Sequence, residues 1–165
     1  MFKKFLRVFP IVLVLISCHH AEKKKINASL IEVSVFGEAG GKTISIDSNG
    51  VVRKCFYRPG TSDCFMDTID NDNIDSINIW LSKIKDTSID SASTDNCIGC
   101  SNYIIRLDAG GESVTTLITG NSRNSEIGKF ARFITGLRVY DGKKVDSVFS
   151  FSTGMRFPIN SPTDF

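Results

Sequence analysis

Two stretches of this chain, residues 74–84 and 127–137, share one spacing of apolar side chains, and this spacing constrains the fold most strongly. Apolar residues three and four positions apart lie on one face of an α-helix. An Asp/Asn cluster at 70–73 and a polar loop at 121–125 precede the two stretches and can cap helix starts. The sequence therefore predicts two amphipathic helices. The shared apolar positions are Ile74, Ile77, Trp80, Leu81 and Ile84, and Ile127, Phe130, Phe133, Ile134 and Leu137.

Hairpin patterns precede both predicted helices. Asn49-Gly50 separates the strand-like runs 43–47 and 51–57, and Gly110-Gly111 separates 103–108 from 113–119. Such turn residues between alternating runs are a strong hairpin signal. The segments ISIDSNG and IRLDAGG also align at the two hairpins.

The predicted fold class is α+β, with two β-β-α units that form one antiparallel sheet and two helices packed on one face. One hairpin and one helix bury too little surface alone, whereas two such units can share a core. Residues 145–151 predict a further C-terminal strand. Chance similarity between the two halves is the alternative, because hairpins followed by helices are common.

The first eighteen residues have the pattern of an export signal. Lys3, Lys4 and Arg7 precede an apolar run at 8–16, which is shorter than the roughly 20 residues that a membrane-spanning helix needs. The run ends in Leu15-Ile16-Ser17-Cys18, which resembles the lipobox of bacterial lipoproteins. The resemblance implies cleavage before Cys18, acylation of its sulfur by a lipid such as palmitate, and anchoring to an envelope membrane.

This resemblance divides the chain. We expect a signal peptide at 1–17, a flexible tether at 18–29, a single α+β domain at 30–151 and a loosely ordered tail at 152–165. The tether is basic and lacks Asp at position 19. The resemblance therefore favours the outer membrane, with the domain facing the periplasm. Loss of residues 1–17 also changes the formal net charge from +2 to −1, so the charge gives no indication of nucleic-acid binding.

Cys18 would carry the lipid, which leaves four cysteines: Cys55, Cys64, Cys97 and Cys100. An even number in an oxidising compartment favours disulfides, and three pairings are possible. Local pairing, Cys55 with Cys64 and Cys97 with Cys100, is the first choice.

The Cys97-Ile-Gly-Cys100 pair has a second interpretation, as a thiol-redox or metal-handling site. A strand rather than a helix is predicted after it, which argues against a thioredoxin-type thiolate. Cys55 and Cys64 stand too far apart in the sequence for a four-cysteine zinc site, so we expect no metal site.

The chain has no histidine after His20, which excludes Ser-His-Asp and Cys-His catalysis from the domain. The sequence thus favours a protein that is not an enzyme and has no cofactor. We expect a non-catalytic binding or structural module, with the bilayer (through acylated Cys18) and another envelope protein as partners. Two alternatives stay open: thiol-redox or metal handling by Cys97 and Cys100, and inhibition of an extracytoplasmic enzyme.

Overall fold

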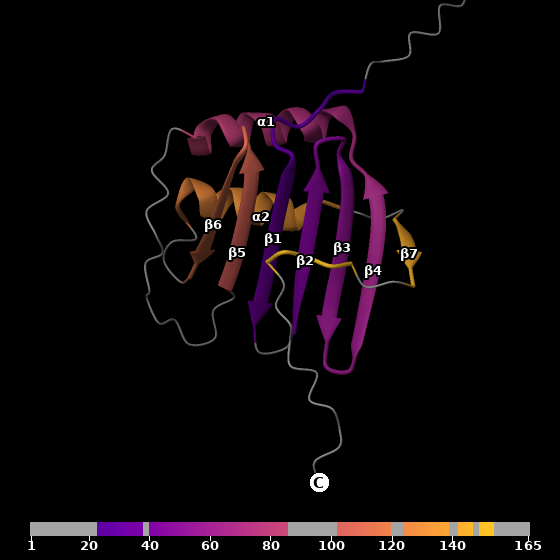
Figure 1. The fold of residues 1–165 in the computed structure, drawn as a ribbon. Coiled ribbons are helices and arrows are strands. Elements are labelled where there is room, and N and C mark those ends of the chain that lie inside the picture. The colour runs from indigo at the N-terminus through magenta and orange to yellow at the C-terminus, as the bar shows by residue number, and fades with distance from the viewer. Residues whose placement is uncertain are drawn as a thin grey trace, which may run out of the picture.

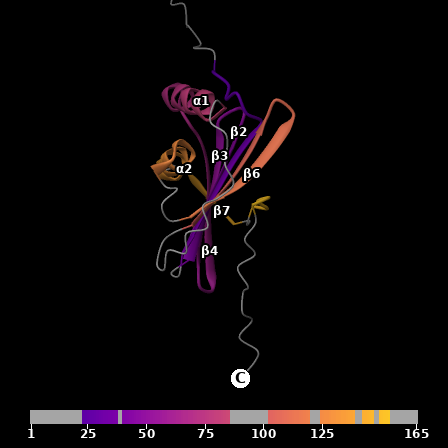
Figure 2. The same ribbon diagram turned by 90° about the vertical axis from the view of Figure 1, so that its left-hand side faces the viewer.

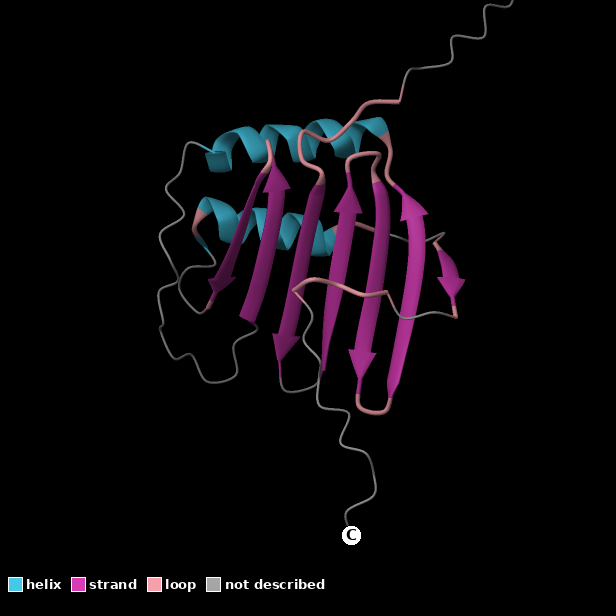
Figure 3. Cartoon of the chain, viewed as in Figure 1, coloured by secondary structure: helices cyan, strands magenta, loops and turns pink. Residues whose placement is uncertain are grey.

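A computed structural model describes residues 23–37, 40–85, 102–119, 124–138, 142–146 and 149–153. These residues form an α+β fold in which one antiparallel sheet of seven strands packs against two helices (Figures 1 and 3). The coarse prediction, an α+β fold with one antiparallel sheet and two helices, is confirmed. In chain order the elements are β1 (Leu30–Gly37), β2 (Gly40–Asp47), β3 (Val51–Arg58), β4 (Thr61–Thr68), α1 (Asn71–Lys85), β5 (Asn102–Ala109), β6 (Glu112–Ile118), α2 (Glu126–Gly136) and β7 (Lys143–Val145).

The strand order is β6-β5-β1-β2-β3-β4-β7, so the first strand of the chain lies in the middle of the sheet. Strands β1 to β4 form a meander, β5 pairs with the other side of β1, and β7 pairs with β4. Four strands precede α1, whereas a β-β-α unit would have two. β4 was not predicted because most of its side chains are polar, which leaves no alternating apolar pattern.

Both helices cover the same face of the sheet (Figure 2). The core between them is formed by alternate residues of the strands, since side chains alternate between the two faces of a sheet. Ile31 and Val33 of β1 are completely buried there, as are Ile77 of α1 and Phe130 of α2. The predicted apolar faces of both helices are therefore confirmed.

The helix starts are capped as the sequence predicts. The Asp70 carboxylate accepts a hydrogen bond of 2.7 Å from the backbone N–H of Asn73. Ser125 does the same for α2, where its hydroxyl accepts from the backbone N–H of Gly128 at 3.2 Å. Both bonds satisfy amides that have no partner within the helix.

Two lysines attach the end of α2 to the sheet. Lys42 Nζ donates to the carbonyl of Thr135 at 2.9 Å, and Lys54 Nζ donates to the carbonyl of Leu137 at 3.3 Å. The last carbonyls of a helix carry partial negative charge, so cations are favourable there. Burial lowers the pKa of both lysines, and the charge of Lys42 lowers the pKa of Lys54 further.

Both predicted hairpins are confirmed. Gly50 has a φ of 73° in the β2–β3 turn, where a Cβ would lie 3.1 Å from the side chain of Ile69. Gly110 and Gly111 both have positive φ, at 61° and 85°, as the tight β5–β6 turn requires.

The predicted C-terminal strand at 145–151 is wrong in extent. The strand β7 is Lys143–Val145, and residues 149–151 are not in a strand. The reason is tertiary: residues 149–153 lie across the face of the sheet opposite the helices, where Ser152 and Thr153 bond to Glu32 of β1 (Figures 1 and 2). These bonds also place the first two residues of the expected tail against the domain.

The ordered domain begins before residue 30. Ile26 and Ala28 are buried, each with 4% of its surface exposed. The backbone N–H of Asn27 donates to the Asn78 side chain at 2.8 Å, and Asn78 donates to the carbonyl of Lys25 at 3.0 Å. Residues 24–29, expected to belong to the tether, therefore contact α1, the β2–β3 turn and the end of β5.

Candidate functional site

A row of polar side chains crosses the sheet on the face opposite the helices. Residues directly paired in an antiparallel sheet point to the same face. Glu32 of β1 pairs with Arg106 of β5 on one side and with Ser45 of β2 on the other, and Ser45 pairs with Arg53 of β3. Glu32 and Ser45 are almost fully buried, with 2% and 5% exposure.

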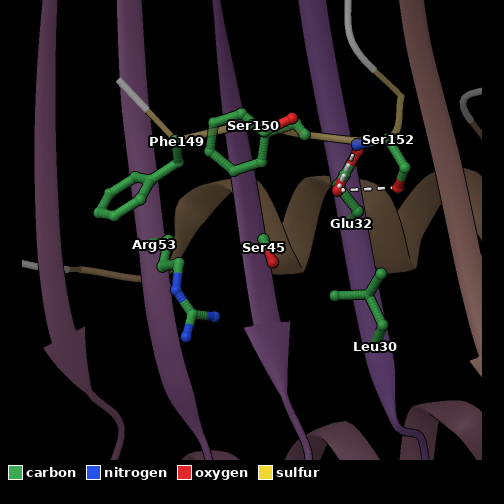
Figure 4. Close-up of a pocket in the computed structure, with 8 residues that line it drawn as sticks. Leu30, Glu32, Ser45, Arg53, Phe149, Ser150 and Ser152 are labelled. Carbon is green, nitrogen blue, oxygen red and sulfur yellow. Dashed lines mark hydrogen bonds between the residues drawn. The ribbon is translucent and has the colours of Figure 1, made fainter. Parts of the chain in front are cut away.

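The buried polar side chains lie beneath residues 149–153, which we call the strap. One carboxylate oxygen of Glu32 accepts from the backbone N–H and the hydroxyl of Ser152, at 3.1 and 3.2 Å (Figure 4). The other oxygen accepts from the backbone N–H and the hydroxyl of Thr153. Four donors therefore compensate the loss of water around this buried carboxylate.

Hydroxyl groups extend this network across the sheet. The Thr153 hydroxyl is 2.7 Å from the Ser34 hydroxyl, which is 2.8 Å from that of Thr43. Burial raises the pKa of Tyr57, the next side chain in the network, and its hydrogen bond with Thr43 partly opposes that rise. The network holds the strap in one position on the sheet.

A cavity of about 410 Å³, the strap pocket, lies between the strap and the sheet (Figure 4). A volume of this size is typical of small-molecule sites. The sheet contributes side chains of β1, β2 and β3, and the strap contributes two phenylalanines and two serines. The lining residues are Leu30, Glu32, Ser45, Arg53, Phe149, Ser150, Phe151 and Ser152.

Arg53 is the cation of the strap pocket. Its Nη1 is 3.6 Å from a carboxylate oxygen of Asp47, which is an ion pair but longer than a hydrogen bond. The other oxygen of Asp47 accepts from the backbone N–H groups of Asn49 and Val51, at 3.0 and 3.1 Å. Asp47 therefore accepts its hydrogen bonds from the β2–β3 turn. The N–H groups of the Arg53 guanidinium can donate hydrogen bonds to a ligand.

The second arginine of the polar row is already occupied. Arg106 donates to both oxygens of Asp108, at 2.9 and 3.0 Å, and the Ser113 hydroxyl donates to the same carboxylate at 2.6 Å. The hydrogen bond from Arg106 lowers the pKa of Asp108, and the bond from Ser113 lowers it further. The Arg106–Asp108 pair lies within β5, and the hydrogen bond from Ser113 joins it to β6. Neither Arg106 nor Asp108 lines the pocket.

Cys55 of β3 and Cys64 of β4 are directly opposite each other, with their Cα atoms 4.1 Å apart and their sulfur atoms at disulfide distance. This is the local pairing expected from the sequence. Because Cys55 pairs with Thr43, the disulfide lies on the same face as the polar row. Cys18, Cys97 and Cys100 lie outside the described residues.

The sequence analysis did not single out the residues of the strap pocket. Glu32 is an isolated acid in the sequence, and Arg53 stands in an ordinary strand pattern. A signal does exist, because Glu32 and Ser34 interrupt an apolar strand at every second position. That pattern shows a polar face, but it does not show that residues about 120 positions away cover it.

Within the ranges that the structure describes, no group of three or more His, Cys, Asp and Glu side chains is placed to hold a metal ion. No helix in the same ranges has the length and apolarity to cross a membrane. No protein-family model, curated protein or solved structure significantly matches this chain. The function is therefore argued from the geometry of the site.

Proposed function

We propose that this protein is a lipid-anchored module of the cell envelope that binds a small ligand, without catalysis, in the strap pocket. The observation that carries the proposal is the pocket itself. It is large enough for a small molecule, and Phe149 and Phe151 give it apolar lining. Its arginine, Arg53, has N–H donors that form no hydrogen bond with a described residue.

Binding rather than catalysis is supported by the state of the acid in the pocket. All four hydrogen bonds to Glu32 come from the strap, so both of its oxygens are occupied by protein donors. A carboxylate held in this way orders the strap and is a poor general base, because abstraction of a proton requires an oxygen within reach of the substrate.

The membrane anchor is supported by the lipobox resemblance at Leu15-Ile16-Ser17-Cys18. Residues 24–29 are docked on the domain, so only a few residues would separate the acylated cysteine from the fold. The pocket would then remain close to the membrane surface. In cells, the Cys18→Ser variant should lose palmitate labelling and membrane association.

Binding can be tested with the mature chain, residues 18–165, that carries Cys18→Ser. A library of small fragments is screened by NMR, and the backbone amides of the strap and of Arg53 report on the pocket. We expect hits that move these amides and that are lost in the variant Phe151→Ala. A screen whose hits all lie elsewhere, or that finds none, would contradict the proposal.

We also propose that the two halves of the domain derive from one β-β-α unit. The alignment of the hairpin segments ISIDSNG and IRLDAGG and of the two helical stretches supports this origin. In that case β1 and β4 are additions to the first copy, one before its β2–β3 hairpin and one between that hairpin and α1.

A further inference from the structure

Among its charged side chains, the strap pocket offers the donors of Arg53 and no unoccupied carboxylate oxygen. Arg53 makes no hydrogen bond to another described residue, and its only charged contact is the 3.6 Å ion pair with Asp47. The acceptor atoms of Glu32 are all taken by Ser152 and Thr153. A ligand that fits this arrangement must therefore bring acceptors to the guanidinium.

From this imbalance we infer that the ligand is an organic monocarboxylate with an apolar body, a conclusion that rests on the proposed binding function. The carboxylate pairs with the Arg53 guanidinium, whose planar fork matches the two oxygens of a carboxylate. Arginine is better suited than lysine to this geometry, because two parallel hydrogen bonds fix both the position and the orientation of the ligand.

The apolar part of the ligand follows from the rest of the lining. Phe149 and Phe151 form an edge-to-face pair, with ring centroids 6.1 Å apart, at the strap side of the pocket. Leu30 lines the pocket from β1. Apolar surface of the ligand that packs on these side chains is removed from water, which favours binding.

The charges around Arg53 limit the ligand to a single negative charge. Glu32 lines the same pocket as Arg53, and Asp47 forms an ion pair with Arg53, so a ligand in the pocket meets one cation and two carboxylates in its surroundings. Arg106 adds no free positive charge, since its guanidinium is bound to both oxygens of Asp108. A dianion such as a phosphate monoester would be repelled by the acids without a second cation to compensate.

The test uses the mature chain with Cys18→Ser and probes that share one apolar body. They are 3-phenylpropionate, the neutral 3-phenylpropionamide, the cationic 3-phenylpropylamine and the dianionic 2-phenylethyl phosphate. Affinity is measured by calorimetry, and the position of binding by NMR shifts of the strap amides. We expect the carboxylate to bind at least about tenfold more tightly than any other probe, since hydrogen bonds between charged groups are the strong ones.

Variants of Arg53 separate charge from geometry. R53Q should weaken carboxylate binding by about tenfold to a hundredfold, whereas R53K should lose less because it keeps the charge without the fork. R58Q is the matched control, because Arg58 lies at the exposed end of the same strand and does not line the pocket. R58Q should bind like the parent protein, and thermal unfolding checks that each variant is folded.

Four results would overturn the inference. Equal binding of the carboxylate and the amide, or an unchanged affinity in R53Q, would remove Arg53 from recognition while the pocket remains a binding site. Tighter binding of the amine would show that Glu32 and Asp47 dominate the site. Failure of all four probes to bind would exclude this ligand class, and the fragment screen would then decide separately whether the pocket binds anything.

Discussion

At the scale of single residues, Glu32 has the largest structural role on the polar face. It lies on the central strand, is 2% exposed, and accepts four hydrogen bonds from Ser152 and Thr153 of the strap. One further hydrogen bond between the described strap and β1 joins Thr153 to Ser34. A buried carboxylate is tolerated only when donors replace its water shell. Glu32 therefore couples the position of residues 149–153 to the stability of the sheet.

The substitution Glu32→Gln should lower the free energy of unfolding by about 2 kcal/mol, because an amide replaces one accepting oxygen with a donor that faces the strap amides. Urea unfolding measures the loss. Chymotrypsin should also cut the variant faster at Phe149 and Phe151. Glu112→Gln, on an exposed end of β6, is the control and should change neither. Equal stability of the two variants would show that the strap is not held by Glu32.

Asp108 makes a pH-dependent contribution to stability. Arg106 and Ser113 lower its pKa below the ordinary value of 3.8. A carboxyl group whose folded pKa is lowered stabilises the fold above its unfolded pKa, and this contribution is lost as the pH falls through the folded pKa. Stability should therefore fall below about pH 4 in the parent protein.

Asp108→Asn removes this contribution. The variant should be less stable than the parent at pH 7, and the difference between the two should shrink as the pH decreases below 4. Urea midpoints at several pH values measure it. Ser113→Ala keeps the Arg106 partner and should give an intermediate pH dependence. If the difference in stability between the parent and Asp108→Asn stays constant down to pH 2, Asp108 is not the source of the pH dependence.

At the scale of elements, the β3–β4 hairpin is held together by a covalent bond. Cys55 and Cys64 are nine positions apart and face each other across the two strands. β4 has few buried side chains, since Cys64 is the only one of its residues that is buried. The disulfide therefore gives this strand a fixed attachment that its own packing provides only weakly.

Replacing both cysteines, Cys55→Ala with Cys64→Ala, should lower the free energy of unfolding by about 2–3 kcal/mol, because the unfolded chain regains the freedom of the closed loop. Urea unfolding without reductant measures the loss. The effect of reductant is measured in a variant that carries Cys97→Ser and Cys100→Ser, because only the Cys55–Cys64 disulfide can then be reduced. An unchanged midpoint after reduction in that background would exclude a stabilising bond.

At the scale of the whole molecule, the domain is closed by segments from both ends of the described chain. Residues 24–29 pack against α1 at one end of the sheet, and the strap covers its polar face. Figure 2 shows the strap and the helices on opposite sides of the sheet. The sheet is thus enclosed on one side by an apolar core and on the other by a polar network.

Ile26→Ala tests whether the N-terminal segment belongs to the domain. Ile26 is 4% exposed within the core cluster, so its truncation should cost about 2–4 kcal/mol of unfolding free energy. Lys25→Ala is the control, because Lys25 is the neighbouring residue in the sequence but does not belong to the core cluster. Its truncation should change the free energy of unfolding by about 0.5 kcal/mol or less. If Ile26→Ala behaves like the control, the segment is a tether after all.

Local patterns predicted the local structure well. The spacing around Trp80 and Phe130 predicted both helices, and the glycine-containing turns predicted both hairpins, because helix amphipathicity and turn chemistry involve neighbours in sequence. The same approach failed for β4, whose polar side chains hide its period, and for residues 149–151, whose β-like composition suited a strand. In the fold residues 149–151 lie across the polar face of the sheet, next to Ser152 and Thr153, which donate hydrogen bonds to Glu32.

The sequence by itself determined the two helices, the turns and the α+β class. It also contains the motif Leu15-Ile16-Ser17-Cys18, whose resemblance to a lipobox supports the proposed membrane anchor. Only the tertiary structure decided that β1 is central in the sheet, that Glu32 is buried beneath the strap, and that Arg53 lines a pocket. The physical reason is distance along the chain. Glu32 and Thr153 are separated by 121 positions. No local sequence pattern can predict their hydrogen bond, because it forms only after the sheet has brought the two residues together.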